Sequence, residues 1–254
     1  MTTPNPAFDL TGRTAVVTGG GRGLGLGMSQ ALLDAGADVV VLARGGVPAD
    51  LEAYAAERGR TVSFYRVDLA DAASIDQVAA EVLAAHTVDI LVNNAGTQDR
   101  YPAAEFPLDA WDTVLDVNLR AVFQLCQLFG RPMLERGEGK IINAASLLTF
   151  QGGLNVAAYA ASKGAVGQLT KALCNEWSGK GVNVNAVAPG YMATDMNEAL
   201  LADPVRLEQL SARIPAGRWG TPEDMGGVVV FLASPAARYV HGQVIAVDGG
   251  WMAR

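Results

Sequence analysis

The fold is decided by the stretch "TAVVTGGGRGLGLG" (14–27), in which a β-branched run enters a glycine-rich turn and then a helical stretch. Such a turn lets the backbone approach a pyrophosphate, which the N-terminus of the helix then stabilises. Its glycines are Gly19, Gly23 and Gly25, in the spacing T-G-x-x-x-G-x-G. Leu26 stands where a G-x-G-x-x-G pattern would need its last glycine. A tight strand-to-helix contact is the alternative, but the position after the first strand favours nucleotide binding.

The same alternation of apolar runs and helical stretches continues along the chain. The runs are continuously apolar, as is typical of strands buried on both faces. Strands that alternate with helices predict right-handed crossovers and a parallel sheet covered on both sides. We therefore expect one doubly wound α/β domain of the Rossmann type over residues 1–254. Its strands are predicted at 14–19, 38–43, 61–68, 89–96, 140–146, 182–190 and 243–250.

Residues 191–220 depart from this rhythm and are called the lid segment below. They put thirty residues between a predicted strand and the next helix start, at "TPED" (221–224). Long insertions in compact domains are commonly lids or binding loops. This one follows the carboxyl end of a strand, where open parallel sheets bind ligands. We expect it to cover a substrate.

Composition limits the classes of function. The net charge is −7 and no run of Lys or Arg occurs, which argues against a nucleic-acid partner. No apolar run reaches the roughly 18 residues of a membrane span, and "MTTPNPAFDL" (1–10) is unlike a signal peptide, so we expect a cytoplasmic protein. Cys126 and Cys174 are expected to be buried free thiols. His86 and His241 lie far apart, so we expect no metal site.

Three further markers follow along the chain. "NNAG" (93–96) ends the fourth predicted strand, and Ser146 ends the fifth. Taken singly, "NNAG" could equally be a turn, and a lone serine in this position is typical of a helix cap or loop. The third marker is Tyr159 with Lys163, four residues apart in a helical stretch and therefore on one face. An ammonium beside a phenol lowers the pKa of the phenol. The alternative is a solvated pair on a surface helix.

In this order, and with the "PG" of residues 189–190, the motifs resemble those of the short-chain dehydrogenases/reductases. The resemblance runs from about residue 8 to residue 252. It implies that Tyr159 is the general acid/base and that Lys163 supports it and holds the nicotinamide ribose. Ser146 would steady the substrate oxygen. Asn118, in "DVNLR" (116–120), would support a proton-relay water behind the lysine.

The resemblance also implies a nicotinamide cofactor along the carboxyl ends of the strands. The residues it assigns to the cofactor are Gly19, Arg22, Gly23, Leu24, Gly25, Arg44, Asp68, Leu69, Asn94, Ala95, Gly96, Tyr159, Lys163, Pro189, Gly190, Met192 and Thr194. The helix of Tyr159 is apolar around much of its circumference, which fits the dimer or tetramer usual in the family. Burial within one chain is the alternative.

Some stretches resemble a narrower group, the 2-dehydro-3-deoxy-D-gluconate 5-dehydrogenases, which act on sugar acids. They include "SLLTFQGGLNVAAYAASK" (146–163) and "VDGGWMAR" (247–254). Gluconate 5-dehydrogenases and 3-oxoacyl-carrier-protein reductases share the core motifs and remain alternatives. A nucleotide-binding sensor without turnover is a remote one. The substrate residues implied are Ser146, Tyr159, Arg100 and Gln151.

The end of the second predicted strand bears on the choice of cofactor. NAD sites place an Asp or Glu about 20 residues beyond the glycines, to accept the ribose 2′-hydroxyl. Here that position is Ala43, followed by Arg44, while Arg22 lies inside the glycine turn. Two guanidinium groups and no carboxylate favour NADP over NAD, although the sugar-acid group generally uses NAD. The alternative is that Arg44 stacks on the adenine or points to solvent.

Overall fold

The computed structural model describes residues 5–194 and 197–254. Seven parallel strands form one sheet in the order β3-β2-β1-β4-β5-β6-β7. The first strand therefore lies inside the sheet, and the strand order reverses between β1 and β4. The expected α/β fold is confirmed. The strands are β1 (Thr14–Thr18), β2 (Asp38–Ala43), β3 (Val62–Arg66), β4 (Ile90–Asn93), β5 (Gly139–Ala144), β6 (Val182–Pro189) and β7 (Val244–Val247).

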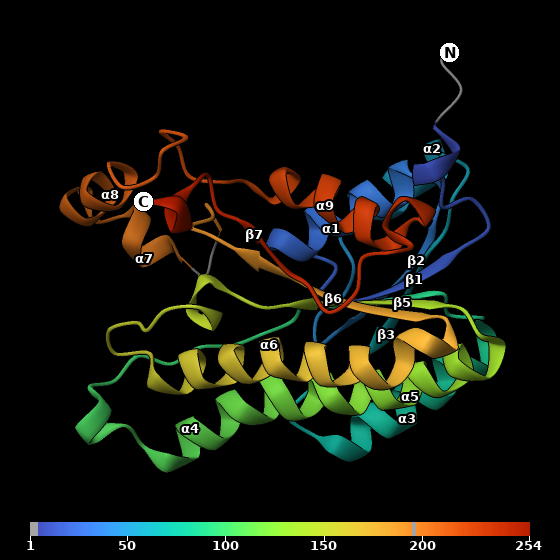
Figure 1. Cartoon of the computed structure of the whole chain (residues 1–254), viewed down its shortest axis with the longest axis horizontal. Coiled ribbons are helices and arrows are strands. Elements are labelled where there is room, and N and C mark those ends of the chain that lie inside the picture. Colours follow the sequence, from blue (N-terminus) through green and yellow to red (C-terminus); the bar gives the residue numbers. More distant parts are fainter. Residues whose placement is uncertain (1–4, 195–196) are drawn as a thin grey trace.

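Helices cover both faces of the sheet, as Figure 1 shows. They are α1 (Gly23–Asp34), α2 (Ala49–Glu57), α3 (Ala72–Ala85), α4 (Leu108–Leu115), α5 (Ala121–Arg136), α6 (Ala157–Trp177), α7 (Glu198–Leu201), α8 (Pro204–Ser211) and α9 (Gly226–Ala233). Val17 of β1 packs in the core with α1 and α9, whereas its neighbour Val16 packs with α3 and α5. Because successive side chains of a strand point to opposite faces, a strand between two helical layers must be apolar throughout.

Several predicted strands run too far at their carboxyl ends. The prediction 89–96 ends at Asn93 in the structure, and 243–250 ends at Val247. The residues beyond these ends, at 94–96 and 248–250, are polar or small, and the backbone leaves the ladder there. This is where the candidate site begins.

The lid segment has secondary structure of its own. It contains α7 and α8, while part of it, residues 195–196, lies outside the described residues. Its two ends are joined, because Ala193 N donates to Gly220 O at 2.8 Å and Gly220 N donates to Tyr191 O at 3.0 Å. The two ends of the lid segment, which we call its neck, are therefore held together by backbone hydrogen bonds, and the segment begins directly after the carboxyl end of β6.

Both cysteines are free, as expected, but only Cys126 is fully buried, while Cys174 is half-buried. In the described parts of the chain, no helix is long and apolar enough to cross a membrane.

Candidate active site

The glycine turn is fastened to the end of β4. Asn94 donates its side-chain N–H to Thr18 O at 3.0 Å, and Ala95 N donates to the Thr18 hydroxyl at 2.9 Å. A β-carbon on Gly25 would overlap the Gly19 carbonyl oxygen and come within 2.6 Å of the Asn94 amide. Only glycine fits at position 25, so two motifs that are about 70 residues apart in sequence form one surface.

Further predicted cofactor residues gather around the start of α1. A β-carbon built on Gly23 would lie 4.0 Å from Thr194 Cγ2, which brings the lid segment to the glycine turn. One built on Gly21 would lie 3.3 Å from Gly46 O, in the loop that follows β2. The first amides of α1 carry the positive end of the helix dipole, and its first turn holds no acidic side chain that would oppose an anion.

Arg22 and Arg44 flank this turn. Arg22 is the residue before α1, with an extended backbone, and Arg44 directly follows β2. Both are exposed, and within the described residues neither guanidinium makes an ion pair or a hydrogen bond. Their charges are therefore available to a ligand.

The predicted cofactor residues that follow β3 and β6 differ in how far they are buried. Asp68 is exposed and accepts a hydrogen bond from Ala70 N at 3.0 Å, while Leu69 packs against the core. Pro189 ends β6, and Gly190 N donates to Val247 O at 2.9 Å. Met192 is buried at the neck of the lid segment.

Asn118 is held in a π-helix, η3 (Asp116–Arg120), between α4 and α5. Its side chain is fully buried, accepts from Thr97 N at 2.8 Å and donates to Thr97 O at 2.8 Å. It also donates to the Ser162 hydroxyl at 3.1 Å. π-Turns inside helices are common at functional sites. Here the turn ties the residue after "NNAG" to the helix that carries Tyr159 and Lys163.

Ser146 caps a short turn and also contacts the tyrosine of the predicted site. Its hydroxyl caps the short turn after β5 by accepting from Leu148 N at 3.2 Å, and it also hydrogen-bonds to Tyr159. Thr149 completes the cap and donates to Lys163 O at 2.9 Å. Serine, tyrosine and lysine therefore belong to one hydrogen-bonded unit between β5 and α6.

Lys163 is buried and donates from Nζ to Ala144 O at 2.6 Å. Its Nζ lies 5.7 Å from the centroid of the Tyr159 ring, and a β-carbon on Gly96 would be 3.7 Å from it. Burial lowers the pKa of Lys163 to about 8. The ammonium is thus costly to keep where it is, which indicates a use for its charge.

The pKa of Tyr159 differs from the expectation. Burial raises it, and the hydrogen bond with Ser146 acts in the opposite direction. The spacing of tyrosine and lysine on the helix predicted a lowered value. The ammonium is directed at Ala144 O instead, so in the protein alone the phenol is the stable form.

A buried polar network lies behind the site and was not predicted. Asn93 donates to Asn143 Oδ1 at 2.9 Å, Asn143 donates to the Thr170 hydroxyl at 3.0 Å, and Thr170 donates to Val166 O at 2.9 Å. These side chains are at most 1% exposed and connect β4 and β5 with α6. Asparagines inside otherwise apolar strands were the signal that could have indicated it, since buried amides need partners.

The substrate residues named from the resemblance lie on two neighbouring loops. Arg100 is exposed, and within the described residues it makes no ion pair or hydrogen bond. Its loop is fixed by Tyr101 N, which donates to Asn155 O at 3.1 Å in the loop of Gln151. Gln151 is half-buried, and Gln151 N donates to Leu147 O at 3.1 Å. Both loops start from strand ends that carry site residues.

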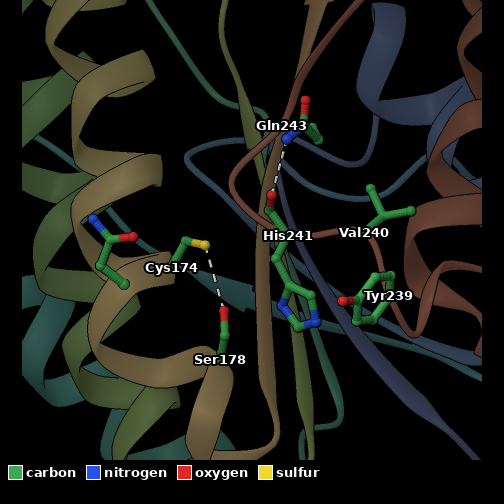
Figure 2. Close-up of a pocket in the computed structure, with 7 residues that line it drawn as sticks. Cys174, Ser178, Tyr239, Val240, His241 and Gln243 are labelled. Carbon is green, nitrogen blue, oxygen red and sulfur yellow. Dashed lines mark hydrogen bonds between the residues drawn. The ribbon is translucent and has the colours of Figure 1, made fainter.

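A cavity of about 570 Å³ lies elsewhere, at the amino end of β7 (Figure 2). His241 and Tyr239 line it from the chain before β7, and Cys174 and Ser178 from the end of α6. Because the strands are parallel and the site residues follow their carboxyl ends, this cavity is not part of the candidate site.

The comparisons with known proteins agree with this geometry. Residues 19–252 match the family model described as enoyl-(acyl carrier protein) reductase. The chain is 52% identical to the 2-dehydro-3-deoxy-D-gluconate 5-dehydrogenase of Pseudoalteromonas atlantica, covering 97% of this chain and 98% of that one.

Two solved structures have the same fold over nearly the whole chain. A candidate NAD(P)-dependent gluconate 5-dehydrogenase from Beutenbergia cavernae, with NADP bound at low occupancy, has a TM-score of 0.94 and 52% identity, covering 98% of this chain and 100% of that one. A candidate 2-deoxy-D-gluconate 3-dehydrogenase from Agrobacterium tumefaciens, with NADP bound, has a TM-score of 0.93 and 47% identity at the same coverage.

Proposed function

Because the chain belongs to the short-chain dehydrogenase/reductase family, we propose that it transfers a hydride between a nicotinamide cofactor and a sugar acid. The observation that carries the proposal is the unit of Ser146, Tyr159 and Lys163 beside the glycine turn. A 2-dehydro-3-deoxy-D-gluconate 5-dehydrogenase activity is the first candidate, and a gluconate 5-dehydrogenase activity is the second, because of the relatives that carry these names.

The residues divide the chemistry among them. When bound, the nicotinamide supplies the hydride donor or acceptor. Tyr159 gives its phenolic proton to the carbonyl oxygen during reduction and takes one from the hydroxyl during oxidation. Ser146 donates a hydrogen bond to the same oxygen as negative charge develops on it. Lys163 stabilises the phenolate by its charge. Asn118 fixes the loop at Thr97 and acts as a positioning residue.

The carboxyl edge of the sheet fits a dinucleotide. The turn at Gly19–Gly25 allows close approach of a pyrophosphate to the amides of α1, and Asn94, Ala95 and Thr194 surround the same space. Lys163 and Gly96 lie next to one another where the nicotinamide end would be held. We propose the lid segment as the cover of the substrate.

The cofactor preference follows from the end of β2. Arg44 and Arg22 are unpaired within the described residues, and Ala43 offers no carboxylate, so a ribose 2′-phosphate would be bound and not repelled. We expect NADP to be preferred by about 10- to 150-fold, the value of one charged hydrogen bond of roughly 1.5–3 kcal/mol. The double variant Ala43→Asp/Arg44→Leu should reverse the preference in kcat/KM. A wild type that already prefers NAD would contradict the assignment.

Arg100 is the proposed partner of the substrate carboxylate, because arginine binds a carboxylate through two parallel hydrogen bonds. Arg100→Ala should raise KM for a sugar acid about 10-fold or more, since a hydrogen bond to a charged group is lost. KM for a neutral ketone should stay unchanged. Arg66→Ala is a matched control on an exposed strand residue away from the loop. An equal effect on both substrates would remove Arg100 from the site.

One screen tests the function itself. Cofactor absorbance is followed with sugar acids, polyols and acyl thioesters, each with NAD and NADP in both directions. Turnover of a 2-dehydro-3-deoxy sugar acid supports the first candidate, and turnover of gluconate supports the second. Turnover of acyl thioesters alone would support a 3-oxoacyl-carrier-protein reductase. No turnover of any substrate would support a nucleotide-binding sensor.

The same proposal includes assembly and location. The outer face of α6 offers Ala161, Ala172 and the open position at Gly164, which suit close packing against a second copy, so we propose a homodimer or homotetramer. Light scattering after size-exclusion chromatography measures its mass. Two unpaired cysteines are typical of a reducing compartment, which supports the cytoplasm.

A further inference from the structure

The end of the chain packs against the lid segment, as Figure 1 shows beside α7 and α8. Ala216 N donates to Gly249 O at 2.9 Å, and Arg254 Nη1 donates to Ala212 O at 3.1 Å. A β-carbon on Gly249 would lie 2.8 Å from Ile214 Cγ2, so the backbone of Gly249 packs directly against the Ile214 side chain. Residues 248–253 are called the tail below.

The tail is itself held rigidly at the end of β7. Asp248 accepts from Gly250 N and from Met252 N, each at 2.8 Å, with one carboxylate oxygen apiece. Gly249 and Gly250 have φ values of +63° and +91°, which other residues rarely adopt. A β-carbon on Gly190 would lie 2.6 Å from Asp248 Cα. The tail is therefore built on the same strand ends as the candidate site.

Trp251 is the centre of the contact. Its ring is 3% exposed, with the Tyr191 ring centroid at 4.6 Å and the Arg213 guanidinium carbon 3.9 Å from its own centroid. The indole N–H has no hydrogen-bond partner among the described residues. A tilted ring contact with Tyr191 and a cation–π contact with Arg213, not hydrogen bonding, therefore hold the indole between the two ends of the lid segment.

A hydrophobic cluster connects the ring of Trp251 to the loop of Ser146. Trp251, Ile214 and Leu210 share a hydrophobic cluster with Leu147, the residue after Ser146. Tyr191, on the other side, follows Gly190 at the end of β6 and packs on the same cluster. A displacement of Trp251 would therefore change how the lid segment sits over the substrate oxygen.

We propose that Trp251 and Arg213 are positioning residues that fix residues 204–219 of the lid segment against the tail, so that they set the substrate KM and not the chemical step. The proposal rests on the proposed function for its kinetic part alone. Arg213 lies outside the acid/base unit, and its charge stacks on the indole, which is the geometry of a cation–π contact.

The kinetic test compares Arg213→Ala and Arg213→Lys with Arg206→Ala, a control on α8. Among the described residues, the Arg206 guanidinium hydrogen-bonds only to Gln209, at 3.5 Å. Arg213→Ala should raise KM by about 2- to 30-fold, the range of a cation–π contact. The change should be equal for a sugar acid and a neutral ketone, with kcat within about twofold. Arg213→Lys should restore KM. A rise for the acid alone would overturn the proposal, because Arg213 would then bind the carboxylate directly.

A second measurement needs no substrate. Amide hydrogen exchange of residues 204–219 should quicken in Arg213→Ala and in Trp251→Leu, and the double variant should add little, since the two side chains form one contact. Arg206→Ala should exchange like the wild type. Unchanged exchange in both variants would overturn the proposal even if the protein turns over sugar acids. Quickened exchange would support it even if the substrate class is wrong.

Discussion

Tyr159→Phe is expected to lower kcat by about 10²- to 10⁴-fold, the usual contribution of a general acid or base. Phenylalanine keeps the ring in place on α6 and removes only the hydroxyl, which carries the transferable proton. Ser146 keeps its contact with Leu148 N, so its loop should not move. The dissociation constant of NADP should change less than about threefold, because no cofactor charge is lost.

The pH dependence gives a second reading of the same residue. Burial raises the pKa of Tyr159 in the protein alone. Oxidation needs the phenolate, so the oxidation rate of the wild type should rise with pH above neutrality, and reduction should not. Ser146→Ala serves as the comparison, because it keeps the phenol but loses the hydrogen bond that lowers the pKa of Tyr159. In this variant the rise of the oxidation rate should move to higher pH. A Tyr159→Phe enzyme with most of its activity would show that the acid/base group is elsewhere.

Lys163→Met is expected to abolish most activity and to stabilise the folded protein. The loss should reach about 10²-fold or more, because the group that stabilises the phenolate is removed. The gain arises because burial lowers the pKa of Lys163 from 10.5 to about 8. A shift of this size corresponds to a burial cost of about 3 kcal/mol in the free energy of unfolding, as an upper bound. The loss of the hydrogen bond to Ala144 O reduces the gain from removing this cost.

The sign depends on pH. Between pH 8 and pH 10.5 the unfolded chain binds more protons at Lys163 than the folded protein does, so this residue makes the wild type more stable as pH rises. Below pH 8 Lys163 is protonated in both states, so the folded protein bears the full cost of burying the ammonium. Urea unfolding of wild type and Lys163→Met at pH 7 and pH 9.5 measures it, with Lys171→Met, an exposed position on the same helix, as the control. A variant that is less stable than the wild type at pH 7 would contradict the burial cost.

The sequence predicts this fold well where its signals are local. The β-branched run before Gly19 and the spacing of Tyr159 and Lys163 each depend on a few neighbouring residues. The strand order depends on crossovers between distant segments, and no local pattern encodes it. The lid segment was harder for the same reason. Its helix α8 has one buried residue, Leu210, whose hydrophobic cluster includes Leu147 and Trp251, both distant in the sequence.

The site shows the same division. The motifs named Asn94, Asn118 and Lys163, but not what each side chain touches. The carbonyl groups of Thr18, Thr97 and Ala144 are the partners that fix them. Backbone groups occur at every residue, so no residue type marks them in a sequence. The direction of the Tyr159 pKa differs from the expectation because burial raises it, while the Lys163 ammonium donates to a backbone oxygen.

The π-helix η3 makes the site depend on the number of residues in the chain as well as on their identity. Each residue turns an α-helix by about 100°, and the wider π-turn lets α4 and α5 each keep their own buried side while Asn118 faces Thr97. A chain one residue shorter here would close into a regular helix. It would then have to rotate either the asparagine or one whole helix away from its contacts. Natural variation in this segment should therefore exchange residues freely on the outer side but conserve its length.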